Sequence, residues 1–144
     1  MQTFSSSKTY AMMVTFKRGD MIVEQLTEML RDEGIVMALI TSGLGAFDRC
    51  NLHVIGGTGL PPVEEFIHLE GPIEVGSIQG TVIGGQPHIH VVVQDVANDK
   101  VYAGHLEPDS RVCYRAAVGL VVLADQSSAM GQDPQTGLVN TALG

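Results

Sequence analysis

The sequence is poor in charge, and above all in basic charge. Only 17% of its 144 residues are charged, and eight Lys and Arg stand against sixteen Asp and Glu, for a formal net charge of −8. Nucleic-acid binding usually needs a basic surface that displaces counterions from phosphates, and Lys17-Arg18 is the only adjacent basic pair. The charge balance therefore argues against autonomous DNA binding. A local basic patch assembled across subunits stays open as an alternative.

Long apolar runs and paired cysteines are also missing. No stretch approaches the roughly 18 consecutive apolar residues of a membrane-spanning helix, and residues 1–10 hold no apolar segment of signal-peptide length. Cys50 and Cys113 lie far apart and form no CxxC pattern, which favours buried free thiols in a reducing cytosol. We therefore expect a cytoplasmic protein that does not enter a membrane.

Tryptophan is absent, whereas glycine is abundant. The 17 glycines indicate tight turns and close backbone packing rather than large aromatic clusters. At 144 residues the chain fits one domain, with a core expected at about 10–125 and a C-terminal arm at 126–144 that is a loop or reaches onto a neighbour. Because 44% of the residues are apolar and few are charged, we expect an oligomer that covers part of this surface.

One amphipathic helix is indicated near the N-terminus. Residues 10–16 read as a strand, and Gly19-Asp20 offers a turn in which Asp20 is the expected N-cap. Gly34 then supplies a C′ glycine after a polar last turn. Between these signals the apolar residues follow the i, i+4, i+7, i+8 spacing of a helix, at Ile22, Leu26, Met29 and Leu30.

The rest of the chain reads as strands. Residues 35–41 form a continuous apolar run, typical of a strand buried on both faces, and residues 42–47 look like a tight turn rather than a phosphate loop. About seven strands with one main helix predict an α+β fold with a mostly antiparallel sheet. The further strand candidates are 49–55, 64–70, 73–82, 89–94, 101–106 and 112–123.

His88, His90 and His105 form the most informative pattern in the sequence. Side chains alternate along a strand, so His88 and His90 point to the same face. Residues 95–100 read as a hairpin turn that returns His105 to their side. Three imidazoles on one face suit zinc or a similar transition metal. The alternative is that they are half-buried structural histidines, hydrogen-bonded to carbonyl groups at a subunit contact.

Two registers of this hairpin are open. A turn centred on Ala97-Asn98 places His90 opposite His105, and His88 opposite Glu107. A turn centred on Asn98-Asp99 places His90 opposite Glu107, with His105 as its diagonal neighbour. Both registers gather three imidazoles and one carboxylate on the same patch.

Three further residues are functional candidates. His53 and His68 each stand alone on a strand and are best explained as ordinary surface or core histidines. Glu74 lies among apolar neighbours and could accept a hydrogen bond from a metal ligand, but a solvated strand residue is the favoured interpretation. No serine lies in a nucleophile elbow, and no pair of residues defines a reaction.

The order of these features resembles the plant and prokaryote conserved (PPC) domain family, whose plant members are joined to AT-hook motifs. The resemblance covers roughly residues 10–125, and its most specific part is the pair of motifs HxH and GHL. Thr136-Gly137-Leu138 is similar to the prokaryotic form. The other matching segments are Gly19-Asp20, Gly34-Ile35, residues 42–46, residues 72–80 and residues 87–90.

The resemblance implies a homotrimer with sheets packed around a three-fold axis. Stand-alone prokaryotic members carry a DNA-binding label by analogy with the plant proteins, and His88, His90 and His105 match positions proposed to hold a metal. This chain has no Arg-Gly-Arg-Pro AT-hook, the part that grips the minor groove, and Ala103 replaces the first glycine of the usual Gly-Gly-His-Leu.

The sequence accordingly predicts a homotrimeric PPC-domain protein that serves as a gene-regulatory or assembly module, with direct DNA binding disfavoured by charge. It would hold a divalent transition metal, zinc before others, through His88, His90 and His105. A zinc-dependent enzyme acting on a small molecule is the alternative, in which Glu107 or Glu74 handles protons. No catalytic residue is assigned.

Overall fold

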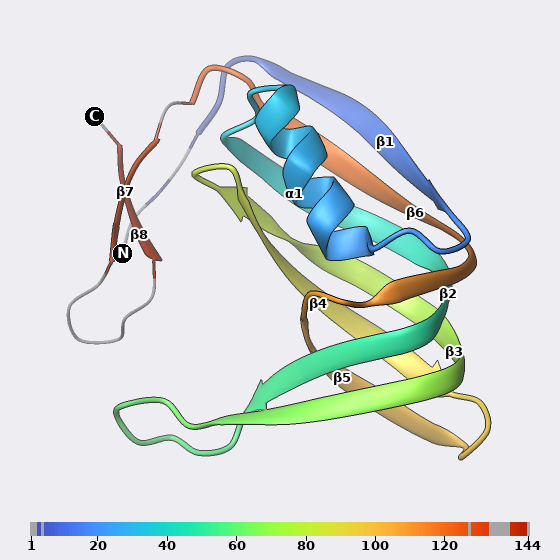
Figure 1. Cartoon of the computed structure of the whole chain (residues 1–144). Coiled ribbons are helices and arrows are strands. Elements are labelled where there is room, and N and C mark those ends of the chain that lie inside the picture. The colour runs from blue at the N-terminus through green and yellow to red at the C-terminus, as the bar shows by residue number, and fades with distance from the viewer. Residues whose placement is uncertain (1–2, 4, 127, 133–138, 144) are drawn as a thin grey trace.

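A computed structural model describes residues 3, 5–126, 128–132 and 139–143 (Figure 1). Its main element is a six-stranded antiparallel sheet with the strand order β1-β6-β2-β3-β4-β5. The α+β prediction is thus confirmed, with one helix, α1 (Ile22–Asp32), among the described residues. The six strands are β1 (Thr9–Lys17), β2 (Met37–Ile55), β3 (Glu64–Ile83), β4 (Gln86–Asp95), β5 (Lys100–Leu106) and β6 (Arg111–Leu123).

The sheet has six strands, whereas about seven were predicted, because two breaks between the eight strand candidates do not exist. The expected turn at 42–47 lies inside β2, and the expected gap near residue 71 lies inside β3. A Cβ atom at Gly43 or Gly45 would stand 2.6 Å from the Cβ of Ile78 or Ala116, respectively. These glycines therefore let β2 bend closely past its neighbours through register shifts, which is a bulge function and not a turn.

The prediction that residues 35–41 are buried on both faces holds only for the start of β2. The adjacent residues Met37 and Ala38 are both buried, whereas Leu39 is 45% exposed. From Ala38 on, the strand therefore alternates between the core and the outer face, as a strand covered on one side does.

The long strand β2 has different partners along its length. Residues 38–49 pair with β6, and Leu52 and His53 pair with Leu106 and His105 of β5. Because β3 and β4 link the other side of β2 to β5, these strands close into a ring. In Figure 1 the sheet curls so that β5 comes back toward the far end of β2. Closure satisfies backbone groups that a free edge would expose.

Helix α1 covers one face of the sheet (Figure 1). Its apolar stripe of Ile22, Leu26 and Leu30 is fully buried and joins the hydrophobic core cluster. The C-terminal end of α1 is as predicted. Gly34 has φ +65°, and the N–H of Ile35 donates to the carbonyl of Leu30 at 2.8 Å, which is a Schellman motif.

The predicted N-cap of the helix was wrong. Met21 holds that position without a side-chain cap. The Asp20 carboxylate instead accepts a hydrogen bond from the N–H of Lys17 at 2.9 Å, so it stabilises the turn before the helix.

The expected loop at the C-terminus is in part a strand pair. β7 (Ser128–Gln132) and β8 (Val139–Leu143) form a separate two-stranded antiparallel sheet. Thr136-Gly137-Leu138 lies outside the described residues. No described helix has the length and apolar character to cross a membrane.

The contact between β3 and β4 yields a stability prediction. A Cβ atom at Gly80 would lie 2.0 Å from the backbone oxygen of His88. We predict that Gly80→Ala lowers the free energy of unfolding by about 1–3 kcal/mol, the usual cost of overpacking, as measured by urea unfolding.

Gly76→Ala is the matched control on the same strand. The nearest atom to its Cβ would be the backbone oxygen of Val92 at an ordinary 3.6 Å. Its free energy of unfolding should change by about 0.5 kcal/mol or less. An equal loss in both variants would contradict the steric explanation.

Candidate metal centre

The hairpin of β4 and β5 brings the three predicted histidines together. His90 lies opposite His105, and Asp95 lies opposite Lys100, which is the register centred on Ala97-Asn98. The expected pairing of His88 with Glu107 does not form, because β5 ends at Leu106 and the ladder stops at His90 and His105.

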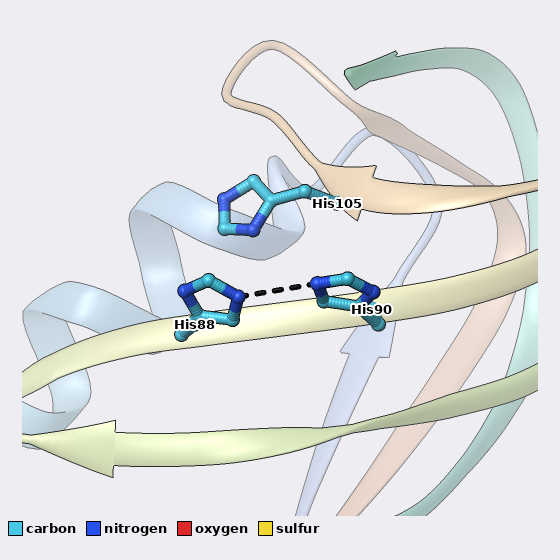
Figure 2. A group of neighbouring side chains, drawn as sticks. All are labelled: His88, His90 and His105. Carbon is cyan, nitrogen blue, oxygen red and sulfur yellow. Dashed lines mark hydrogen bonds between the residues drawn. The ribbon is translucent and has the colours of Figure 1, made fainter. Parts of the chain in front are cut away.

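The three imidazoles are spaced as ligands of one ion would be. The Nε2 atoms of His88 and His90 are 3.1 Å apart, and one nitrogen from each of the three residues lies within 4.8 Å of the others. Two nitrogens bound to one tetrahedral zinc are about 3.3 Å apart, given bonds of about 2.05 Å. Figure 2 shows the rings of His88 and His90 side by side on β4, with His105 facing them from β5.

One nitrogen of this group has no partner in the protein. His105 Nδ1 is buried and makes no hydrogen bond. In Figure 2 the ring nitrogen nearer the main chain is on the side that faces His88 and His90. A buried polar atom without a partner costs about 1–3 kcal/mol, a cost that an ion bound by this nitrogen would remove. Three imidazole nitrogens are a donor set that fits zinc.

The histidines open onto a cavity of about 710 Å³. Its wall combines these three imidazoles and that of His53 with apolar surface from Ile55 and Pro62 and with one carboxylate, Glu64. An ion held by three protein ligands at this place would keep a coordination position facing the cavity. Open positions of this kind distinguish reactive or ligand-binding sites from closed structural ones.

Two of the histidines, His88 and His105, favour the neutral form that binds metals. Burial lowers the pKa of His88, and the neighbouring His90 and His53 lower it further. Burial is also the main cause that lowers the pKa of His105, to about 4, with His88 and His53 adding to the shift and Glu107 opposing it.

Sequence reasoning missed His53. This residue of β2 pairs with His105 of β5, their ring centroids are 4.5 Å apart, and its Nδ1 contacts the Glu107 carboxylate. His53, His105 and Glu107 therefore form a second group with ligand spacing. The sequence shows that His53 lies on a strand with alternating burial. Only the pairing of β2 with β5, which the sequence does not show, brings His53 to the metal site.

The other two candidates lie apart from the histidine group. His68 contacts Asn51 Oδ1 through its Nδ1 at 2.9 Å, as an ordinary strand histidine does. Glu74 is exposed on β3 between Ala46 and Gln94, which agrees with the favoured reading of a solvated residue.

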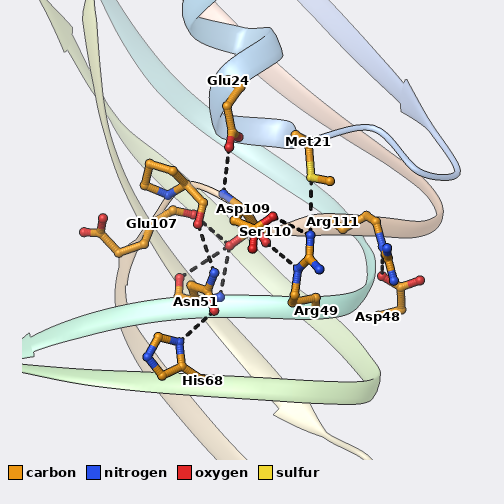
Figure 3. Close-up of polar contacts among 11 residues, drawn as sticks. Met21, Glu24, Asp48, Arg49, Asn51, His68, Glu107, Asp109, Ser110 and Arg111 are labelled. Carbon is orange, nitrogen blue, oxygen red and sulfur yellow. Dashed lines mark hydrogen bonds and ion pairs between the residues drawn. The ribbon is translucent and has the colours of Figure 1, made fainter.

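The turn that carries Glu107 is fixed to β2 (Figure 3). The N–H of Glu107 donates to the carbonyl of Asn51 at 2.9 Å. The buried hydroxyl of Ser110 donates to the carbonyl of Glu107 at 2.8 Å and accepts from the N–H of Asn51 at 3.0 Å. An ion pair between Arg49 and Asp109 adds a further tie.

The lowered pKa of His105 predicts a pH dependence of the metal-free protein. The unfolded chain takes up a proton near pH 6.5, whereas the folded chain resists it until about pH 4. The contribution of His105 to the free energy of unfolding is therefore complete above pH 6.5, falls between pH 6.5 and 4, and is flat below pH 4. The loss is on the order of 3 kcal/mol. Urea unfolding in the presence of a chelator measures it.

Two variants isolate this effect from the titration of other groups. His105→Gln should show a shallower loss of stability over this pH window, whereas His68→Gln should keep the slope of the wild type. The same slope in all three proteins would refute the assignment.

Comparisons with solved structures and family models identify proteins that are similar to this chain. It is 26% identical to a metal-containing protein from Archaeoglobus fulgidus, with 99% of each chain covered and a TM-score of 0.80. It is 24% identical to a plant- and prokaryote-conserved (PPC) protein from Pyrococcus horikoshii, with 99% and 96% covered and a TM-score of 0.72. A "putative dna binding protein" from Bacteroides thetaiotaomicron is 20% identical, with 96% of each chain covered and a TM-score of 0.74.

No curated protein matches the sequence. The model of the Plants and Prokaryotes Conserved (PCC) domain, the family that the PPC protein above represents, matches residues 2–124. The chain therefore belongs to the Plants and Prokaryotes Conserved domain family.

Proposed function

We propose that this protein is a metal-binding module of the family, in which His88, His90 and His105 hold a divalent transition metal, zinc before others. The observation that carries the proposal is the buried, unpartnered Nδ1 of His105 beside two Nε2 atoms 3.1 Å apart. The similar protein from Archaeoglobus fulgidus is described as metal-containing, which supports the proposal.

The cavity favours a second candidate, a zinc-dependent enzyme. Zinc with an open position acts as a Lewis acid and lowers the pKa of bound water. The chain's own residues would then bind and orient a small molecule: Ile55 and Pro62 offer apolar contacts, and Glu64 a hydrogen-bond acceptor. No described residue is assigned to a proton transfer on this substrate.

Any role in gene regulation would be indirect, through other proteins that bind DNA, and not through direct DNA binding by this chain. The chain carries a net charge of −8, so its averaged field repels a polyanion. The "putative dna binding protein" from Bacteroides thetaiotaomicron shares 20% identity, a level that supports the fold alone.

We also propose a cytoplasmic location, because both cysteines are free thiols, the usual state in a reducing cytosol. Burial raises the pKa of the Cys50 thiol to about 12.

We also propose a homotrimer. Met13, Leu39 and Leu44 are 72%, 45% and 62% exposed, and the strand registers place them on one outer face of β1, β6 and β2. A clustered apolar surface of this kind marks an interface more often than a free face. The number three comes from the family resemblance.

Metal content tests the central proposal. Protein that is stripped by a chelator and re-equilibrated with zinc should carry about one zinc per chain, because three neutral imidazoles suffice for tight binding. His88→Ala/His90→Ala should carry almost none, as measured by elemental analysis. His68→Ala, which removes a histidine outside the group, should bind like the wild type. Equal zinc in the double variant would overturn the site.

Light scattering tests the assembly. The wild type should have three times the chain mass of 15.3 kDa. Met13→Glu/Leu44→Glu places charges on the apolar face and should shift the mass toward the monomer, because desolvating these carboxylates is costly. A monomeric wild type would contradict the trimer.

A further inference from the structure

We propose that Glu107, held by His53, positions His105 for the metal by fixing which of its ring nitrogens carries the proton. This inference rests on the proposed metal site. The Glu107 carboxylate would accept a hydrogen bond from the Nε2–H of His105. The lone pair of His105 Nδ1 is then free to bind the ion. Glu107 is thus a positioning residue that acts through His105.

The two nitrogens of His105 have different surroundings. Nδ1 is buried without a protein partner, whereas Nε2 lies 3.7 Å from Glu107 Oε1. The side chains of His105 and Glu107 are only 19% and 24% exposed, so water screens this contact weakly. A distance of 3.7 Å is about 0.5 Å beyond a good hydrogen bond, which a small rotation of the ring would close.

This arrangement is the one that metal-bound histidines favour. Such a histidine typically donates its second N–H to a carboxylate, which sets the tautomer, orients the ring and makes the metal-binding nitrogen more basic. A neutral imidazole has one N–H and one lone pair. The charge of Glu107 makes Nε2 the better place for the proton, and the same charge offsets part of the charge of a bound cation.

Glu107 is itself held from two sides. Its carboxylate contacts Nδ1 of His53, and the rings of His53 and His105 lie 4.5 Å apart at a tilt of 31°. Its backbone is fixed to β2 through Asn51 and the buried Ser110 (Figure 3). A carboxylate restrained in this way keeps its place when the ion arrives, whereas a free side chain would lose conformational entropy.

A second metal bound by His53, His105 and Glu107 is the competing arrangement, since their ligand atoms also lie close together. We favour the hydrogen-bonded pair because His53 Nδ1 and Glu107 Oε1 are in direct contact. The metal stoichiometry separates the two arrangements.

The test combines zinc affinity with the tautomer of His105. Glu107→Ala should still bind one zinc per chain, but with an affinity reduced about 10–100-fold, the usual cost of losing such a partner. Glu107→Gln keeps an acceptor oxygen without the charge and should recover part of the loss. Glu74→Gln is the matched control, because Glu74 is an exposed carboxylate of β3 that lies apart from the histidine group; its affinity should equal that of the wild type.

Nitrogen-15 NMR of the metal-free protein supplies a readout that a merely structural role would not move. His105 should carry its proton on Nε2 in the wild type and in Glu74→Gln, and should become a mixture of tautomers in Glu107→Ala. Thermal unfolding of each variant confirms that it is folded.

Each other outcome is decisive. Wild-type affinity and an unchanged tautomer in Glu107→Ala would overturn the positioning role and leave the metal site intact. Two zinc ions per wild-type chain and one in Glu107→Ala would overturn it in favour of the second metal. No zinc in the wild type would instead overturn the proposed function, and the positioning role with it.

Discussion

The pairing of β2 with β5 is the constraint on which the site depends. It joins Leu52 to Leu106 and His53 to His105, closes the ring of strands and removes an open edge. The same pairing fixes the start of the turn that carries Glu107, because its N–H donates to the carbonyl of Asn51 on β2. Without it, β4 and β5 would still present three histidines, but His105 would lack both a neighbour on β2 and a held carboxylate.

The scarcity of basic residues in the chain also makes this site suitable for a cation. The described wall around the histidines contains no Lys or Arg, and burial keeps His88 and His105 neutral. Neutral imidazoles repel a cation far less than charged ones and offer their lone pairs to it. The acidic balance that argues against DNA thus suits a cation, and Glu107 supplies a nearby negative charge.

Local patterns predicted much of the fold. The apolar spacing identified the helix from Ile22, and Gly34 ended it as expected, because a helix stripe and a left-handed glycine depend on neighbours a few residues away. The β4–β5 hairpin and its register were among the two predicted choices for the same reason. The prediction of a turn at 42–47 was wrong because glycine is common both in turns and in β-bulges. Only the atoms of Ile78 and Ala116 across the strands distinguish the two.

The sequence by itself determined the α+β class, the single long helix and the gathering of His88, His90 and His105, since strand alternation and a short hairpin connect them. Tertiary structure alone decided that His53 and Glu107 join them, and that one nitrogen of His105 is buried without a partner. The physical reason is separation along the chain. β2 and β5 meet through a ring closure that depends on the bend and twist of the whole sheet, and no local pattern near His53 records it.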